Sequence, residues 1–180
     1  MSTDETRLIQ RAKEGDPAAF AELYDQYQPA IYRYIFYRVD DTATAEDLTA
    51  DVFVRLVERI DRFTYRGRPL LAWLYTIARN LVMDHHRRSG RSVPLSPDTP
   101  RIAEIPDPEE TAEDALEQQR LAAALSCITE DQRDVIILKF IEGLDNETVA
   151  QTLGKSVGAV KALQHRALAA LRRVMRPNEG

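Results

Sequence analysis

Cysteine, glycine and long apolar runs are all scarce in this 180-residue chain. The single cysteine, Cys127, excludes an intrachain disulfide and a cysteine-based zinc site, and it favours a reducing, intracellular setting. Its neighbours are apolar, so we expect its side chain to be buried. No apolar run approaches the ~20 residues that cross a bilayer, and the acidic N-terminal residues do not resemble a signal peptide. We therefore expect a cytoplasmic protein without membrane insertion.

The sequence also lacks a strand pattern, because its apolar residues recur every three or four positions and no stretch alternates cleanly. Five of the nine prolines lie close together, at Pro94, Pro97, Pro100, Pro106 and Pro108. Proline disfavours helix at its own position and at the preceding residue. We therefore predict an all-α fold with an N-terminal helical bundle at residues 1–90 and a C-terminal helix-turn-helix domain at residues 113–180. An extended acidic linker at residues 91–112 joins these two small domains.

The negative charge of the chain is concentrated in one segment. A total of −5 at pH 7 is unusual for a protein that binds nucleic acid. Between Pro97 and Glu117, however, there are eight acidic residues and one basic residue. From Lys155 to Arg176 there are six lysines or arginines and no acidic residue. The C-terminal part can therefore neutralise phosphates although the whole chain is acidic.

Capping patterns predict where the helices begin. Starts are expected at Ser2, Asp16-Pro17, Thr44 with Asp47, Pro69, Thr111, Thr129 with Gln132, Asp145 or Asn146, and Ser156. We expect Pro29 to break or restart the helix that follows Asp16. Gly143 and Gly154 are predicted helix ends, because glycine is favoured just after a helix.

Residues 145–173 predict a helix-turn-helix, with Ala150 as the small residue, Gly154 in the turn and Val160 in the core. In the last helix the buried stripe should comprise Val160, Leu163, Ala167, Leu171 and Val174. The opposite, basic face presents Lys161, His165, Arg172 and Arg176. The pattern favours binding to duplex DNA, and the alternative is an ordinary helical hairpin with a solvated basic face.

A second candidate DNA surface lies on the helix that begins at Pro69. Its outward face carries Thr76, Arg79, Asn80, Met83, His86 and Arg87. Just upstream, two aromatic residues and two arginines stand close together, at Phe63, Tyr65, Arg66 and Arg68. Aromatic rings stack on bases and cations hold phosphates, so this combination suits single-stranded DNA. The alternative is that Phe63, Tyr65 and Trp73 only pack within the protein.

Two further polar groups allow weaker interpretations. Asp47, Asp51 and Glu58 share the outward face of their helix, which is either solvated or a docking surface for a basic partner helix.

Asp84, His85 and His86 could suggest a metal-dependent enzyme, but no second ligand cluster accompanies them. We also find no glycine-rich phosphate loop and no nucleophile motif. We therefore expect no metal, no cofactor and no enzymatic activity.

With these residues in place, the chain resembles the sigma-70 family of bacterial transcription initiation factors, and within it the extracytoplasmic-function (ECF) group. The resemblance rests on four blocks in order: FAELYDQYQPAIYRYI, AEDLTADVFVRL, LLAWLYTIARNLVMDHHRR and LSCITEDQRDVIILKFIEGLDNETVAQTLGKSVGAVKALQHRALAALRR. In the family these blocks correspond to the start of region two, the helix that docks on the polymerase clamp, the minus-ten helix, and region four.

The resemblance implies roles for individual residues. Docking on the polymerase clamp falls to Asp47, Asp51, Phe53, Arg55 and Leu56. Reading of the minus-ten element falls to Arg79, Asn80, Met83, Asp84, His86 and Arg87, with residues 63–68 as the loop that holds a flipped base. Reading of the minus-thirty-five element falls to Lys155, Ser156, Gly158, Ala159, Lys161, Ala162, His165 and Arg166.

One departure from the family pattern concerns the last helix, where Leu163 replaces a common arginine and Gln164 a common leucine. Periodicity places Leu163 in the core, and the small Ala159 and Ala162 make few bidentate base contacts. Reading of the minus-thirty-five element is thus expected to depend on phosphate contacts and DNA shape.

The resemblance also implies partners, namely the clamp and flap of core RNA polymerase, promoter DNA and an anti-sigma factor. The alternative function is a stand-alone helix-turn-helix regulator that binds duplex DNA as a dimer.

Overall fold

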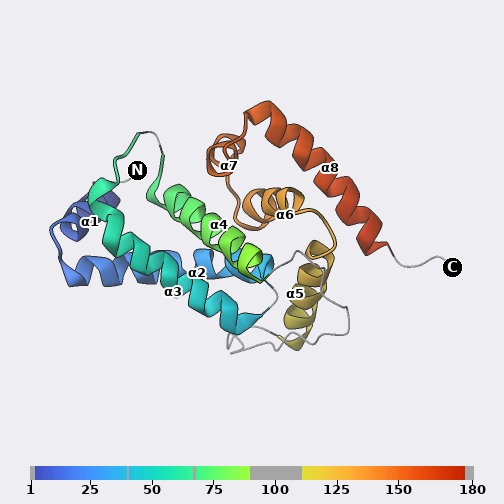
Figure 1. The fold of residues 1–180 in the computed structure, drawn as a ribbon, viewed down its shortest axis with the longest axis horizontal. Coiled ribbons are helices and arrows are strands. Elements are labelled where there is room, and N and C mark those ends of the chain that lie inside the picture. The colour runs from blue at the N-terminus through green and yellow to red at the C-terminus, as the bar shows by residue number, and fades with distance from the viewer. Residues whose placement is uncertain (1–2, 40, 67, 90–110, 177–180) are drawn as a thin grey trace.

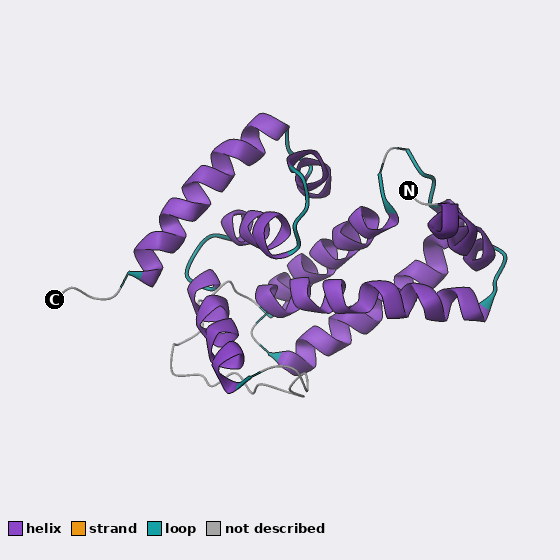
Figure 2. Cartoon of the chain, turned by 180° about the vertical axis from the view of Figure 1, so that it is seen from behind, coloured by secondary structure: helices purple, strands orange, loops and turns teal. Residues whose placement is uncertain are grey.

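The structure is a computed structural model, and it describes residues 3–39, 41–66, 68–89 and 111–176. Every regular element in these ranges is helical (Figures 1 and 2). The N-terminal elements are α1 (Thr3–Lys13), α2 (Pro17–Arg38), α3 (Thr42–Arg59), the 3-10 turn η1 (Ile60–Arg62) and α4 (Leu70–Arg88). The C-terminal elements are α5 (Ala112–Leu125), α6 (Glu130–Ile136), the π turn η2 (Ile137–Ile141), α7 (Asn146–Leu153) and α8 (Val157–Met175). The all-α prediction is therefore confirmed for the described part, while the segment predicted as a linker lies mostly outside it.

Helix α2 is continuous through Pro29, so the predicted break is wrong. The proline is exposed, whereas Tyr27 and Ile31 on either side of it are buried in the core. Packing of these flanking side chains outweighs the local cost of one missing backbone hydrogen bond. The start of the helix follows the prediction, because the Asp16 carboxylate accepts a hydrogen bond from the Ala18 amide.

Helix α3 begins earlier than predicted. Its N-cap is Asp41, whose carboxylate accepts hydrogen bonds from the amides of Ala43 and Thr44, so the expected start at Thr44 is wrong. The apolar side of the helix packs on α2 and α4 through Leu48, Val52 and Leu56. This packing fixes which side of α3 remains exposed.

The C-terminal helices begin where the capping patterns predict. Thr111 and Thr129 form reciprocal capping boxes with Asp114 and Gln132, while Asp145 caps α7 and Ser156 caps α8. Gly154 ends α7 with a φ of 65°, in the left-handed region that glycine adopts without strain. Cys127, predicted to be buried, is exposed because it follows the last turn of α5.

The two helical groups contact each other directly. Helix α7 packs on α4, and η2 packs on α2, so both C-terminal elements lie against the N-terminal group (Figure 1). Within the C-terminal group, α8 packs on α6 and α7. None of the described helices has the length and apolar character that a membrane span requires.

Candidate functional site

The last helix, α8, presents its basic side to solvent as the sequence predicts. Val160, Leu163 and Ala167 form its buried side, which confirms the core position of Leu163. Val174, expected in the same stripe, is 39% exposed because the helix extends beyond the helices it packs on. The expected DNA-contacting residues Gly158, Ala159, Lys161, Ala162, His165, Arg166, Arg172 and Arg176 are all exposed, as is the N-cap Ser156.

Helix α4 and the segment before it carry the expected minus-ten residues, but these residues have different surroundings. Asn80 is exposed, and Met83, Asp84 and Arg87 line a cavity together with it. In the preceding segment Tyr65 is 48% exposed and Arg66 is also exposed.

Phe63 is only 6% exposed, with its ring centroid 5.4 Å from that of Trp73, so the packing interpretation fits this residue. Arg68 donates a hydrogen bond to the Thr76 hydroxyl, which ties the segment to α4. Burial lowers the pKa of Arg68 from its ordinary value.

Arg79 and His86, two of the expected minus-ten residues, are paired with acids of α6. Arg79 Nε lies 3.1 Å from Asp134 Oδ2, and Arg79 Nη2 lies 3.7 Å from Asp131 Oδ1. His86 Nδ1 lies 2.7 Å from Glu130 Oε1. These acidic side chains cover part of the outward face of α4.

Asp131 also contacts the other predicted DNA surface, because Lys155 Nζ lies 3.3 Å from its Oδ2. The Asp131 carboxylate is therefore shared by two cations. Arg79 is expected to contact minus-ten DNA, and Lys155 is expected to contact the minus-thirty-five element.

Beneath these pairs lies a buried ionic contact between the two helical groups. Arg38 Nε is 2.6 Å from Asp134 Oδ1, and the two side chains are 0% and 1% exposed. Tyr34 donates its hydroxyl hydrogen to the same carboxylate at 2.7 Å. Burial raises the pKa of Tyr34, and the Asp134 charge raises it further. Burial alone would lower the pKa of Arg38, but Asp134 and Tyr34 outweigh it, so the net pKa is raised.

A second contact joins α2 and α4 to the residue after η2. Arg33 donates two hydrogen bonds of 2.7 Å to the Glu142 carboxylate, and the Tyr75 hydroxyl donates one of 2.9 Å. Burial, together with the Glu142 charge, raises the pKa of Tyr75. Sequence reasoning missed both contacts. Arg38, which stands between Tyr37 and Val39, was a usable signal, whereas Asp134 follows a run of polar residues and gave none.

The outer face of α3 carries the predicted acidic docking residues Asp47 and Asp51, both exposed. Phe53 and Leu56, expected to dock with them, are 8% and 1% exposed and belong to the core, so they support the helix from inside. Arg55 is half-buried and lines the cavity that α3 shares with α4.

Two exposed valines that the sequence reasoning missed, Val54 at 54% and Val57 at 53% exposure, lie between the acids of α3. We call Asp47, Asp51, Val54, Val57 and Glu58 the docking face.

The histidine pair that could have suggested a metal is arranged differently from a ligand set. The ring centroids of His85 and His86 are 5.9 Å apart, and His86 is paired with Glu130. In the ranges that the structure describes, no three or more His, Cys, Asp or Glu side chains come together to hold an ion.

Comparison with known proteins gives the family. The family model of sigma-70 region 2 matches residues 23–92, and that of sigma-70 region 4 matches residues 118–171. The ECF RNA polymerase sigma factor BldN of Streptomyces coelicolor is 42% identical over 172 residues, which are 93% of this chain and 64% of BldN. The chain thus spans less than two thirds of the length of BldN.

Two further proteins match over most of their own length. The ECF RNA polymerase sigma factor SigD of Mycobacterium tuberculosis is 33% identical over 171 residues, 92% of this chain and 81% of SigD. The sigma factor RpoE of Bartonella quintana, solved with the anti-sigma factor NepR, superposes with a TM-score of 0.71. The two sequences are 28% identical, and the superposition covers 89% of this chain and 98% of the RpoE chain.

The region 2 match covers α3 and α4, which carry the docking face and the expected minus-ten residues. The region 4 match covers the helix-turn-helix of α7 and most of α8. The resemblance drawn from the four sequence blocks is confirmed by these matches. The chain belongs to the sigma-70 family of RNA polymerase sigma factors, and within it to the extracytoplasmic-function group.

Proposed function

We propose that this sigma factor binds core RNA polymerase and directs it to promoters by recognising their minus-ten and minus-thirty-five elements. The observation that carries the proposal is that both family regions are present and that each presents an exposed polar helix face. In this role the chain acts in the cytoplasm with the polymerase, as a binding subunit and not as an enzyme, and it needs no metal or cofactor.

The two regions divide the work. Residues 1–90 form region 2, which docks on the polymerase clamp and melts and reads the minus-ten DNA. Residues 113–180 form region 4, which docks on the flap and reads the minus-thirty-five element. Residues 91–112 are the linker that lets both regions bind at once. Joining two weak sites raises the overall affinity through the effective concentration of the second site.

The docking face of α3 suits the clamp. Its acidic side chains provide charge complementarity to a basic partner helix, and the exposed valines provide apolar area at the centre of the contact. Phe53 and Leu56 hold α3 in position through the core.

The two DNA surfaces have different tasks. Asn80 has an amide that can both donate to and accept from a base edge, so it discriminates between sequences. Arg172 and Arg176, near the end of α8, neutralise phosphates of the upstream duplex. Lys155, Lys161, His165 and Arg166 add charge and hydrogen bonds along the major groove.

An anti-sigma factor is the proposed regulator. RpoE of Bartonella quintana, which shares this fold, was solved with the anti-sigma factor NepR. A partner of this kind would inhibit initiation by covering the docking face or the corresponding face of region 4.

The test is initiation by reconstituted polymerase. The chain is added to purified core polymerase, and transcript starts are mapped across genomic DNA. Starts that share a minus-ten and a minus-thirty-five sequence support the proposal. No promoter-specific initiation, together with tight duplex binding by the chain alone, would favour a stand-alone dimeric regulator instead.

A further inference from the structure

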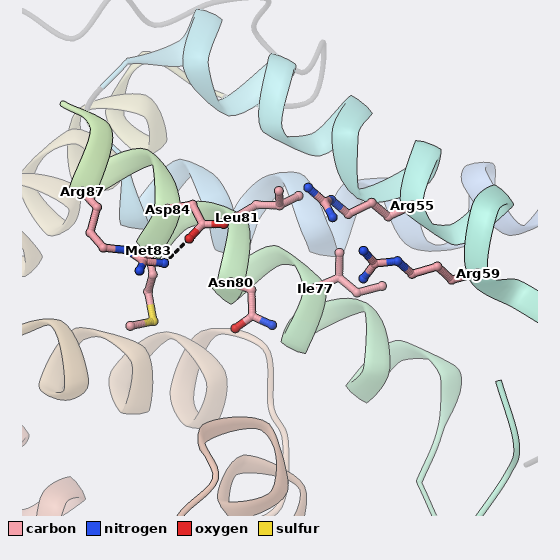
Figure 3. Close-up of a pocket in the computed structure, with 8 residues that line it drawn as sticks. All are labelled: Arg55, Arg59, Ile77, Asn80, Leu81, Met83, Asp84 and Arg87. Atoms are coloured by element: carbon pink, nitrogen blue, oxygen red, sulfur yellow. Dashed lines mark hydrogen bonds and ion pairs between the residues drawn. The ribbon is translucent and has the colours of Figure 1, made fainter. Parts of the chain in front are cut away.

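A cavity of about 350 Å³ lies between α3 and α4 (Figure 3). Eight residues line it: Arg55, Arg59, Ile77, Asn80, Leu81, Met83, Asp84 and Arg87. The volume lies within the range of protein pockets that hold small molecules or parts of larger ones. Arg59 belongs to none of the surfaces assigned above, so the cavity brings an additional cation next to Asn80.

Two of the three guanidinium groups in this cavity are unpaired. Arg87 forms an ion pair with Asp84. In contrast, Arg55 and Arg59 have no ion-pair or hydrogen-bond partner among the residues that the structure describes. They are four positions apart and therefore share one face of α3. Figure 3 shows both side chains reaching from α3 towards α4. The cavity thus holds uncompensated positive charge.

Besides the arginines, the cavity is lined by apolar side chains and by the side-chain amide of Asn80. Ile77 and Leu81 are 6% and 8% exposed and form an apolar surface beside the guanidinium groups. Asn80 offers one acceptor and two donor hydrogens. An anionic phosphate suits the arginines, a flat base suits the apolar surface, and a base edge suits the amide. This combination is the chemistry of a nucleotide.

The polar side chains of α4 that line the cavity belong to a longer row of polar side chains on that helix. Asn80, Asp84 and Arg87 follow each other at helical spacing, so polar groups continue along the helix beyond the space that one nucleotide fills. A strand, and not a free nucleotide, therefore matches the surface. Asp47 and Asp51 are exposed on α3, and Arg59 is not among the residues expected to dock on the polymerase, so docking leaves Arg59 available. Arg55, which the sequence predicted for docking, lines the cavity beside it.

We propose that this cavity receives a nucleotide of the unpaired promoter strand, and that Arg59, assisted by Arg55, holds its phosphate. The proposal rests on the proposed function and adds to it a residue that determines affinity. Arg59 positions the strand so that the base edge faces Asn80. Helix α3 then serves the polymerase with one face and the DNA strand with another.

The first measurement is the affinity of assembled holoenzyme for a fork-junction probe whose minus-ten segment is single-stranded on the non-template strand. Arg59→Ala should weaken this binding about tenfold, the effect of losing one charged hydrogen bond. It should also lower the slope of log affinity against log salt by ~0.7. Arg59→Lys keeps the charge and should recover part of the loss. Arg62→Ala is the matched control, because Arg62 is exposed and lies outside the cavity.

The second measurement locates the phosphate. Each phosphate of the single-stranded segment is replaced in turn by a neutral methylphosphonate, and every probe is titrated with the parent and with the Arg59→Ala holoenzyme. At one position the methylphosphonate should weaken binding by the parent but should not weaken binding by Arg59→Ala any further. The neutral phosphate and the missing arginine remove the same contact, so their effects do not add. Affinity of the variant for core polymerase should equal that of the parent.

The outcomes separate this proposal from the proposed function. The phosphate role is overturned if Arg59→Ala and Arg62→Ala bind the probe equally, or if no methylphosphonate position suppresses the effect of Arg59→Ala. In either case the parent would still initiate at promoters. If the parent itself fails to initiate, the proposed function fails, and the proposal for Arg59 fails with it.

Discussion

At the scale of single residues, Asp134 is the side chain on which the contact between the two groups depends. Its two oxygens contact Arg38, Arg79 and the Tyr34 hydroxyl while it is 1% exposed. Moving a charged pair out of water is costly, and the attraction between the two opposite charges offsets part of that cost. Removal of one partner leaves the other as an uncompensated buried charge.

We therefore expect Asp134→Ala to destabilise the protein by about 3–5 kcal/mol. Urea unfolding followed by circular dichroism measures the free energy. Fluorescence of Trp73, the single tryptophan, reports on the N-terminal group separately. The matched control is Asp131→Ala, which removes a carboxylate that is 45% exposed and should cost about 0.5 kcal/mol. Equal losses for the two variants would contradict the importance given to burial.

A second prediction at this scale distinguishes base contacts from phosphate contacts. Asn80→Ala should change the ranking of minus-ten variants by initiation, because an amide reads the base edge. Arg172→Ala and Arg176→Ala should weaken initiation about uniformly across promoter sequences. Transcription from a library of minus-ten variants measures both effects. An unchanged ranking for Asn80→Ala would remove its assigned role.

At the scale of elements, local chemistry predicts most of the helix starts. Caps at Asp16, Thr129, Asp145 and Ser156 were readable because each side chain bonds an amide within three residues. The continuity of α2 through Pro29 was not readable, because it depends on core packing. The packing of Phe63 on Trp73 likewise depends on contacts between separate elements.

The cap of α7 gives a prediction with a pH dependence. A backbone hydrogen bond from the Thr148 amide lowers the pKa of Asp145 below its ordinary value. Asp145→Ala should therefore cost about 1 kcal/mol of stability at neutral pH. Because the folded-state pKa is lowered, this contribution is complete above the ordinary pKa of an aspartate and is lost as the pH falls below it.

Urea unfolding of the parent and of Asp145→Ala at neutral and at acidic pH measures this change. The difference between the two proteins should shrink in acid. A constant difference across the series would show that the carboxylate charge is not responsible.

At the scale of the whole molecule, acids of α6 in the C-terminal group pair with cations that are expected to contact DNA. Arg79 and His86 of region 2 and Lys155 of region 4 are all paired with acids of α6. The proposed minus-ten contacts need Arg79 and His86 as well, so we expect the contact between the groups to compete with DNA for these two residues. The sequence could not predict this arrangement, because the paired residues lie far apart along the chain and follow no periodic pattern.

Loosening this contact at a place away from DNA should therefore favour DNA binding. Glu142→Ala removes the carboxylate that Arg33 and Tyr75 share, and Glu142 lies outside both predicted DNA surfaces. We expect the variant chain, without polymerase, to bind a fork-junction probe several-fold more tightly than the parent does. Fluorescence anisotropy measures the affinity, and Glu14→Ala is the control on an exposed, distant residue. Unchanged affinity would mean that the contact does not limit access to DNA.

The same contact has a consequence for the order of folding. The bonds that join the two groups link residues between 44 and 109 positions apart. Helices and their neighbours within one group form first, because closing a long loop costs entropy before any contact compensates for it. Docking of the two groups is then the last step of folding, and their separation is the first step of unfolding. A refolding chain should pass through a stage in which both groups are formed, the docking is absent, and Arg79 and His86 are not yet paired with α6.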